Sequence, residues 1–224
     1  MQRIAHRGAK REFPENTIPA FRRAFERGAD AVELDVHATR DGVVVVHHDE
    51  VLHAAAGLPS ARIADLTWAE LRTVQLAPAI GVPTLTDVIA AAPASSTLYV
   101  EIKGAEIESL VAPILSRAAV ACAVHSFDHE AIARIRGIAP GIPRGILFER
   151  TVPDLESVLA RTGARDVWPH WSLIDAPLLS RAHELGARVI AWTVNDRAVA
   201  ASLAAMGVDG LCGDDVRLFD DLGA

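Results

Sequence analysis

Short apolar runs alternate with amphipathic helical stretches along the whole chain. This alternation is typical of a parallel sheet whose strands are joined by crossover helices. The predicted strands lie near residues 4–6, 31–36, 97–103, 121–126, 145–148, 166–169, 188–194 and 210–212. Eight strands are the number that closes a (β/α)8 TIM barrel. We therefore expect the α/β fold class, with a single TIM-barrel domain over residues 1–224.

The helices between these strands are predicted from their apolar faces and from the residues at their ends. In the first helix Ile18, Phe21 and Phe25 share one face, and Gly28 follows the last turn. The predicted helices cover residues 14–27, 106–117, 129–138, 154–161, 176–185 and 197–206.

The longest break in this rhythm is the segment of residues 52–83. It holds a predicted helix over residues 67–76, and a second helix begins near Thr86. We interpret the segment as a short helical insertion over the barrel mouth.

A β-hairpin is predicted after the second strand, where two β-like runs flank the dipeptide Asp41-Gly42. If this dipeptide forms a two-residue turn, Asp35 lies opposite His48. Side chains alternate along a strand, so Glu33 and Asp35 share one face, and His48 lies on that face too. The hairpin thus predicts that two carboxylates and an imidazole meet.

Composition narrows the class of protein. Half of the 224 residues are hydrophobic and 23% are charged, which predicts a sizeable core and argues against long disordered stretches. The formal net charge of −7 argues against general nucleic-acid binding, which needs clustered Lys and Arg. Cys122 and Cys212 are expected to be reduced, buried small hydrophobes rather than a disulfide framework.

The first residues form no apolar signal region, and the chain has no run of ~18 apolar residues. We therefore expect a cytoplasmic protein without stable membrane insertion. The sequence leaves the oligomeric state open.

Three carboxylates are candidate metal ligands. Glu33 and Asp35 share a face of an apolar strand, and Glu101 follows a second apolar run. Buried carboxylates must be paired, hydrogen-bonded or metal-bound, because an isolated buried charge is very costly. Three acids at one barrel face suit one hard divalent cation, such as Mg2+ or Ca2+. The alternative is ion pairing, of Glu101 with Lys103 and of Glu33 with a nearby arginine.

Two histidines are candidates for proton transfer. His6 ends the first predicted strand, at the barrel face where such enzymes keep their sites. An imidazole titrates near pH ~6.5, which suits an acid or a base, although a lone histidine here could also be a cap or a core residue. The predicted register places His47 opposite Val36, away from the carboxylates, so His48 rather than His47 is expected to transfer protons.

Two cations stand next to these candidates in the sequence. Arg7 follows His6, and Lys103 follows Glu101 by two positions. Both can bind phosphate oxygens, Arg with a planar fork and Lys as a point charge. The alternative is that each of them neutralises the neighbouring acids and does nothing else.

These residues belong to a series of short motifs that spans nearly the whole chain. The motifs are His6-Arg7-Gly8, Pro14-Glu15-Asn16-Thr17, Glu33-Leu34-Asp35-Val36, Asp41-Gly42, His48-Asp49, Glu101-Ile102-Lys103, Ser126-Phe127-Asp128 and Trp192-Thr193-Val194-Asn195. In kind and in order they resemble the motifs of the glycerophosphodiester phosphodiesterase family. The first five lie within about fifty residues, which makes the resemblance highly specific.

The resemblance implies a reaction and a first set of roles. Glu33, Asp35 and Glu101 match the family's ligands for one divalent cation, Mg2+ or Ca2+. His6 and His48 match its acid–base pair. The implied reaction cleaves a small glycerophosphodiester to glycerol 3-phosphate and an alcohol. In the family's mechanism the glycerol 2-hydroxyl attacks phosphorus first, and water then opens the resulting cyclic phosphate.

The resemblance also implies a set of substrate contacts. Arg7 and Lys103 match the family's phosphate-contacting positions. Glu15 matches an acid that supports the site, and Trp192 matches an aromatic wall of the pocket. A metal bound among these residues would orient the attacking hydroxyl and lower its pKa.

Two stretches depart from the family pattern. After His48-Asp49 the family usually carries Leu-x-Arg-Thr-Thr, whereas residues 52–56 read Leu-His-Ala-Ala-Ala. Near the C-terminus the usual Asp-Gly-x-x-Thr-Asp-x-Pro lacks its Thr and its Pro in residues 209–216. The metal and acid–base sets are untouched. We therefore expect phosphodiester cleavage with a weak preference for the alcohol head group.

Two other functions stay open. A phospholipase D-like relative acting on lysophospholipids would carry an apolar lid, for which the insertion offers Leu58, Ile63, Leu66 and Trp68. A catalytically silent binding module for a phosphate metabolite would need no acid–base pair, so the two histidines argue against it. A serine hydrolase is not supported, because the chain has no Gly-x-Ser-x-Gly elbow.

Overall fold

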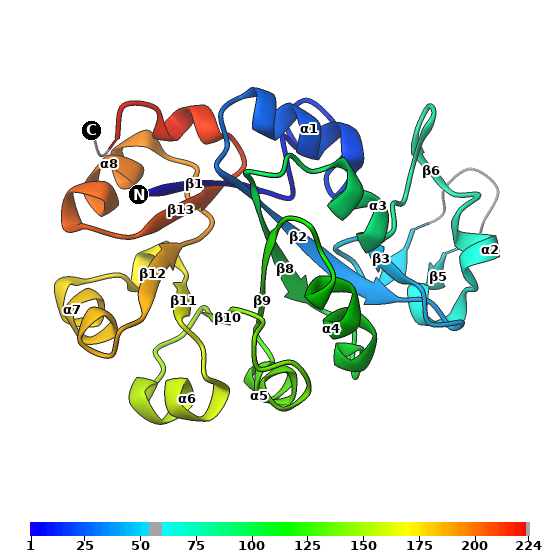
Figure 1. Cartoon of the computed structure of the whole chain (residues 1–224). Helices are drawn as coiled ribbons and strands as arrows, with labels where there is room; N and C mark the ends of the chain where they lie inside the picture. The colour runs from blue at the N-terminus through cyan, green and yellow to red at the C-terminus, as the bar shows by residue number, and fades with distance from the viewer. Residues whose placement is uncertain (54–59, 223–224) are drawn as a thin grey trace.

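A closed ring of eight parallel strands forms the centre of the computed structural model, which describes residues 1–53 and 60–222 (Figure 1). The ring consists of β1 (Gln2–His6), β2 (Ala31–Ala38), β8 (Thr97–Ile102), β9 (Ala121–Ser126), β10 (Arg144–Phe148), β11 (Asp166–Pro169), β12 (Arg188–Ala191) and β13 (Gly210–Gly213). Strand β1 pairs with both β2 and β13, which closes the ring. The predicted TIM barrel is confirmed, with all eight predicted strands in place.

Helices lie outside the ring and connect successive strands (Figure 1). They are α1 (Ile18–Glu26), α3 (Leu85–Ala91), α4 (Glu108–Ser116), α5 (His129–Ile138), α6 (Leu155–Thr162), α7 (Ala176–Glu184) and α8 (Arg197–Met206). Aspartates at the N-caps of α5 to α8 accept backbone N–H bonds that the first turn cannot satisfy internally. Short 3-10 helices η2 (Trp171–Leu173) and η3 (Val216–Phe219) complete the outer layer. Within the described ranges, no helix is both long enough and apolar enough to cross a bilayer.

The barrel interior contains one buried side chain from each strand, and we call this set the inner ring. Its members are Ile4, Ala31, Tyr99, Ala123, Leu147, Trp168, Ile190 and Cys212. A second and larger core fills the space between the strands and the helices. Because side chains alternate along a strand, each strand contributes to both cores. Cys212 is buried and free, as expected, whereas Cys122 is free and partly exposed.

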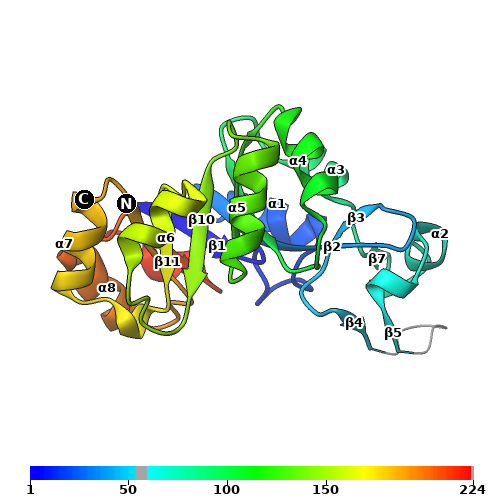
Figure 2. The same ribbon diagram turned by 90° about the horizontal axis from the view of Figure 1, so that it is seen from below.

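The chain between β2 and α3 forms an insertion that projects from one side of the barrel (Figure 2). It contains β3 (Val44–Val46), β4 (Val51–Leu52), β5 (Ala61–Arg62), η1 (Ile63–Asp65), α2 (Trp68–Leu71), β6 (Gln75–Ala77) and β7 (Ile80–Gly81). The insertion has a small core of its own, which includes Val45, Ile63 and Leu71. The predicted insertion is therefore present, although it holds β-hairpins as well as helix.

Two predicted helices are shorter in the structure. The first begins at Ile18 rather than at residue 14, because Asn16 takes a left-handed backbone with φ of 57° and Thr17 caps the helix. The helix predicted over residues 67–76 is confined to α2, a single turn that opens with a capping box between Thr67 and Glu70. Residues 72–73 form a turn, and β6 begins at Gln75.

The predicted register of the hairpin after β2 is wrong by one residue. Val36 pairs with Val46 and Ala38 with Val44, so three residues, not two, form the turn. The Thr39 hydroxyl bonds the Asp41 carboxylate at 2.6 Å, and the Thr39 N–H donates to the Val43 carbonyl at 2.9 Å. These bonds across the turn stabilise the longer loop.

Candidate active site

On each strand, the residue two positions after the inner-ring member also points toward the barrel axis, because side chains alternate along a strand. These residues lie closer to the carboxyl ends of the strands than the inner ring does. Six of them line one cavity of about 230 Å³ at the barrel mouth: His6, Glu33, Glu101, His125, Glu149 and Trp192. The inner-ring residues Leu147, Trp168 and Cys212 form its floor. The mouth of the barrel thus holds a polar chamber above an apolar base.

The three predicted metal ligands lie together at this mouth. Asp35 on β2 is the register partner of Glu101 on β8, and Glu33 lies two residues before Asp35. Their exposed fractions are 3% for Glu33, 0% for Asp35 and 8% for Glu101. Three carboxylates are therefore withdrawn from water within a small volume, which requires compensating charge.

The pKa values of these acids move in opposite directions. Burial, followed by the neighbouring charge of Asp35, raises the pKa of Glu33 to about 7 and that of Glu101 to about 7. Burial would also raise the pKa of Asp35, but the charges of Arg7 and Lys103 outweigh it and hold that pKa below its ordinary value. Asp35 is thus the carboxylate that stays ionised most readily.

Asp35 has the closest polar partners of the three acids. Its Oδ2 accepts a hydrogen bond from Asn16 Nδ2 at 2.8 Å and lies 3.1 Å from Arg7 Nε. Its Oδ1 lies 3.7 Å from Lys103 Nζ. Asn16 also accepts from the Asp35 backbone N–H through Oδ1, at 3.2 Å. Asn16 belongs to a quoted motif, but its contact with Asp35 was not predicted.

His6 faces the chamber with its Nε2 atom. Its Nδ1 lies 2.7 Å from Asp214 Oδ1, and its Nε2 lies 4.0 Å from Glu33 Oε2. A carboxylate on Nδ1 favours the tautomer with the proton there, which leaves Nε2 free to accept a proton. Asp214 in turn bonds Asn195 at 2.9 Å. Asp214 lies in the C-terminal stretch that departs from the family pattern, and sequence reasoning did not assign it a role.

His48 also lines the chamber, although not for the predicted reason. In the observed register His47, not His48, lies opposite Asp35, since the His47 N–H donates to the Asp35 carbonyl at 3.0 Å. Strand β3 ends at Val46, so strict alternation no longer applies to His47 and His48. His48 Nδ1 bonds Asp49 Oδ1 at 2.7 Å, and Nε2 lies 3.2 Å from Lys103 Nζ. His48 therefore has the same Nδ1–carboxylate arrangement as His6.

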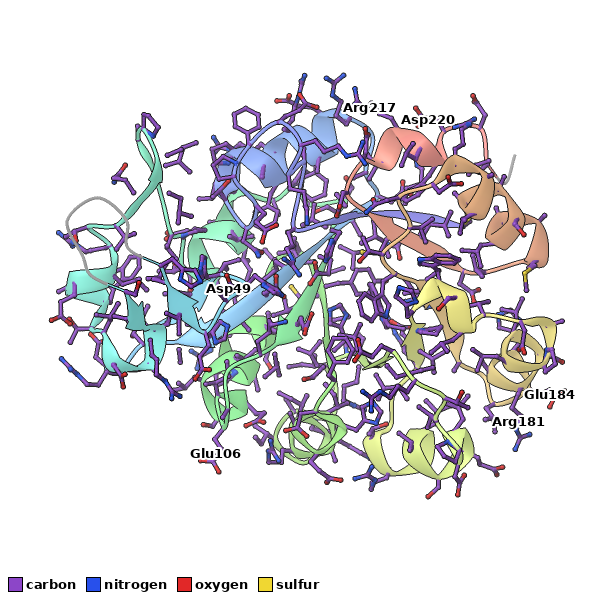
Figure 3. All side chains as sticks on the ribbon, turned by 180° about the vertical axis from the view of Figure 1, so that it is seen from behind. Asp49, Glu106, Arg181, Glu184, Arg217 and Asp220 are labelled. Carbon is purple, nitrogen blue, oxygen red and sulfur yellow. The ribbon has the colours of Figure 1, made fainter. Side chains whose placement is uncertain are left out.

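Asp49 lies between β3 and β4 of the insertion. In Figure 3 it lies well inside the outline of the molecule, whereas Arg181 and Glu184 of α7 project from the rim. The bond to His48 lowers the pKa of the Asp49 carboxyl, so this partner stays ionised.

Arg7 reaches the chamber from the loop after β1. Its guanidinium bonds Glu15 at 2.9 Å, and Glu15 also lies 3.2 Å from Lys10. The Arg7 backbone is left-handed, with φ of 59°, and its N–H donates to Glu33 Oε2 at 3.2 Å. The next residue must be glycine, because Gly8 has φ of 82° and a Cβ there would come within 2.8 Å of the Ala20 backbone.

Both predicted phosphate-binding cations pair with acids in this structure. Arg7 contacts Asp35 and Glu15, while Lys103 lies 3.3 Å from Glu101 and 3.7 Å from Asp35. Both cations thus neutralise neighbouring acids. Both side chains also line the chamber, so neutralisation and phosphate contact are compatible.

His125 is a chamber residue that sequence reasoning missed. It is the register partner of Glu101 and is 1% exposed. Its Nε2 lies 3.8 Å from Glu33 Oε1, and burial lowers its pKa to about 4. The available signal was its position one residue before the Ser126-Phe127-Asp128 motif, at the end of a predicted strand.

Several buried atoms in the chamber lack hydrogen-bond partners among the described residues. They are Glu33 Oε1, Asp35 Oδ1 and both ring nitrogens of His125. One ligand atom each from Glu33, Glu101 and His125 lie within 4.8 Å of one another. Unpartnered donor atoms around clustered negative charge fit a bound cation.

Trp192 forms part of an aromatic wall. Its indole N–H donates to the Trp168 carbonyl at 2.8 Å, and its ring packs edge-on against Phe127 and His170. The hydrogen bond fixes the plane of the indole beside the chamber.

The apolar residues that could have formed a lipid-binding lid pack inside the insertion instead. Ile63 is fully buried, and Leu66 and Trp68 pack against the insertion's core. Leu58 lies outside the described residues, as do residues 54–56 of the divergent stretch. The arrangement of Ile63, Leu66 and Trp68 does not favour a lipid-binding lid.

Residues 6–218 match the model of the glycerophosphoryl diester phosphodiesterase family. The chain is 32% identical to the protein YhdW of Bacillus subtilis over 228 residues, covering 94% of this chain and 93% of the relative. It is 30% identical to the glycerophosphodiester phosphodiesterase of Caldanaerobacter subterraneus subsp. tengcongensis, covering 95% and 93% of the two chains.

Solved structures show the same likeness. An Oleispira antarctica phosphodiesterase in complex with the product sn-glycerol-3-phosphate is 25% identical and superposes with a TM-score of 0.89, covering 97% of this chain and 95% of the other. The glycerophosphodiester phosphodiesterase of Thermotoga maritima is 28% identical, with a TM-score of 0.82 and coverage of 98% and 97%.

The raised pKa values of Glu33 and Glu101 predict how stability depends on pH when metal is removed. Between pH 4.5, the ordinary value, and about 7, the folded protein keeps protons that the unfolded chain has released. These two carboxyls should therefore make folding stability in EDTA fall as pH rises through this window, and a divalent cation should reverse their contribution. Burial lowers the pKa of His125 to about 4 and also lowers the pKa values of His37 and His47, which adds a rise in stability over part of the same window, so the carboxyl contribution is read as a difference between wild type and a variant. Urea unfolding at about pH 5 and about pH 7.5, with EDTA or with Mg2+, measures this directly.

Glu101→Gln is the matched control, because it removes one of the two titrating groups and keeps the side-chain shape. Because the histidines are common to both proteins, the stability of wild type should fall more, or rise less, between the two pH values than that of this variant. Asp214, whose pKa is lowered to about 2, titrates below the window and does not interfere. Equal pH dependence in wild type and Glu101→Gln would contradict the assignment.

Proposed function

This chain belongs to the glycerophosphoryl diester phosphodiesterase family, and from that premise we propose that it hydrolyses glycerophosphodiesters to glycerol 3-phosphate and an alcohol, with one divalent cation. One observation carries the proposal: His6 and His48 each bond a carboxylate through Nδ1 while they line a chamber of buried carboxylates. A silent binding module has no need of such a pair. The product bound to the Oleispira phosphodiesterase supports glycerol 3-phosphate as the product here.

Glu33, Asp35 and Glu101 would hold the cation, which we propose to be Mg2+ or Ca2+. The buried and unpartnered oxygens of Glu33 and Asp35 support this choice. The cation, when bound, supplies positive charge for the phosphoryl oxygens and lowers the pKa of a nearby hydroxyl.

His6 and His48 divide the proton transfers between them. His6 Nε2, with its Nδ1 proton held by Asp214, accepts the proton of the glycerol 2-hydroxyl as that oxygen attacks phosphorus. His48, when protonated on both ring nitrogens with Nδ1 held by Asp49, gives its Nε2 proton to the leaving alcohol oxygen and becomes neutral. The two roles reverse when water opens the cyclic phosphate.

Arg7 and Lys103 position the phosphate between the two histidines. Glu15 and Asp35 fix the orientation of the Arg7 guanidinium. Its remaining N–H groups are then available to bind phosphate oxygens. Lys103 lies next to His48, where its charge meets the phosphate oxygens on the leaving-group side. Trp192 supplies the apolar wall for the glycerol carbons.

A second cavity, of about 400 Å³, offers space for the leaving alcohol. It shares His48 and Lys103 with the chamber and is further lined by Glu50, Arg62 and Gly104. The acid that protonates a leaving oxygen must lie beside it, so the alcohol extends past His48 into this cavity. Glu50 and Arg62 form an ion pair at its wall and are both more than half exposed. A wall with both charge signs suits several polar head groups without strong preference.

Hydrolysis assays on purified protein test the proposal. Glycerophosphocholine, glycerophosphoethanolamine and glycerophosphoinositol should be cleaved at comparable kcat/KM in the presence of Mg2+, Ca2+ or Mn2+. Removal of metal should abolish turnover, and a divalent cation should restore it. Lysophospholipids should be poor substrates. Full activity in a sample shown to be metal-free, or lysophospholipid as the best substrate, would overturn the proposal.

The two adjacent histidines should differ sharply. His48→Ala should lower turnover by ~10²–10⁴-fold, the usual contribution of a positioned acid or base, with metal affinity nearly intact. A nitrophenyl ester should partly rescue this variant, because its leaving group needs less protonation. His47→Ala is the matched control and should lose little turnover, since His47 is not among the described residues that line the chamber. An inactive His47→Ala with an active His48→Ala would reverse the assignment.

The ion pair at the second cavity should tune head-group choice. Glu50→Gln leaves the Arg62 charge unbalanced, so kcat/KM for choline and ethanolamine esters should fall about two- to fivefold relative to the inositol ester, the scale of an exposed ion pair. Arg62→Gln should shift the ratio in the opposite direction. If neither substitution moves the ratio, the alcohol does not occupy this cavity.

A further inference from the structure

His125 is a buried imidazole whose ring nitrogens have no hydrogen-bond partner among the described residues. It lies at the end of β9, is 1% exposed and faces the chamber. Leaving a buried polar group unsatisfied costs roughly 1–3 kcal/mol, so such groups are retained where something else satisfies them. No protein group among the described residues does so for His125.

The ring is held in a fixed orientation by its neighbours. Tyr99 stacks on it with centroids 6.2 Å apart and an interplanar angle of 6°, and Trp168 packs against it edge-on at 4.4 Å. Both neighbours belong to the inner ring, whose members are at most 4% exposed. The imidazole is therefore not free to turn toward another partner.

A carboxylate oxygen near the ring is too far for a hydrogen bond but well placed for a shared ion. His125 Nε2 lies 3.8 Å from Glu33 Oε1, which is itself unpartnered. Donor atoms that share an ion at ~2.0–2.3 Å lie about 3–4 Å apart. A ligand atom of Glu101 completes the group, with all three atoms within 4.8 Å of one another.

We propose that His125 is a nitrogen ligand of the cation and raises the affinity of the site for Co2+ and Zn2+ relative to Mg2+ and Ca2+. The inference rests on the proposed function, because it concerns the same cation. Mg2+ and Ca2+ prefer oxygen ligands, whereas imidazole favours later divalent metals. One imidazole beside carboxylates therefore shifts the selectivity of an otherwise all-oxygen site.

Pulsed EPR of the Mn2+-loaded protein tests the ligand directly. Wild type should show coupling of Mn2+ to a directly bound imidazole nitrogen. His125→Gln should lose that coupling and keep a bound Mn2+. His6→Gln is the matched control, because His6 Nε2 also lies near Glu33, at 4.0 Å, and this variant should keep the coupling.

Calorimetric titration with each metal tests the selectivity. His125→Gln should lose at least about tenfold in affinity for Co2+ and Zn2+, since even outer-shell partners of a metal contribute that much. Its affinity for Ca2+ should change less than about threefold, which also shows that the variant is folded. If His125→Gln does not fold, the spectra of wild type and His6→Gln still decide.

Bound Mn2+ without nitrogen coupling in wild type would overturn the inference, as would coupling that disappears in His6→Gln. Failure to bind Mn2+ at all would do the same. The proposed function fails in a different way, by absence of hydrolysis with every metal. Active enzyme whose bound Mn2+ lacks nitrogen coupling would thus refute the role of His125 and leave the hydrolase assignment standing.

Discussion

Carboxylates buried side by side at the barrel mouth repel one another, and much of the surrounding structure compensates for that repulsion. Two unit charges ~4 Å apart repel by about 4 kcal/mol at an effective dielectric of ~20. Arg7, Lys103 and Asn16 converge on Asp35, the carboxylate with the most partners. Arg7 and Asn16 both have left-handed backbones. Such conformations cost of order 1–3 kcal/mol each and persist where surrounding contacts fix them, as the bonds to Asp35 and Glu15 do here.

The barrel has a charged cluster at each end, and an apolar layer separates the two clusters. At the opposite end of the strands, Arg188 donates to both oxygens of Asp166 at 2.8 Å and to the Tyr99 hydroxyl at 3.0 Å. The inner ring lies between this pair and the chamber. Tyr99, a member of the inner ring, contacts both clusters: its ring stacks on His125, and its hydroxyl accepts a hydrogen bond from Arg188. A closed and densely packed middle thus keeps two charged clusters apart and holds the chamber walls at fixed positions.

The fold was predictable because its signals are local and repeated: eight apolar runs separated by amphipathic helices are legible without knowledge of contacts. Glu33, Asp35 and Glu101 were predictable because an acid in an apolar run has few explanations. The hairpin register was not, because it depends on a Thr39–Asp41 bond inside the turn. His48 reaches the chamber because β3 stops at Val46. Asp214 and His125 were missed, since their importance comes from neighbours distant in sequence. For His125 the local signal was limited to its position at the end of a predicted strand.

The bond between His6 and Asp214 joins residues 208 positions apart, through the strands that close the ring. A ribosome adds ~5–20 residues per second, so about 10–40 s separate the synthesis of these two side chains. His6 on the first strand therefore has no Asp214 carboxylate to bond until the last strand has been synthesised. During that interval β2 is already available to pair with β1, while the other edge of β1 has no neighbour until β13 emerges. A sheet that lacks β13 has two unpaired edges, β1 and the last strand added, and such edges are where strands associate with other chains. The pairing of β13 with β1 closes both edges and brings Asp214 to His6 in the same step.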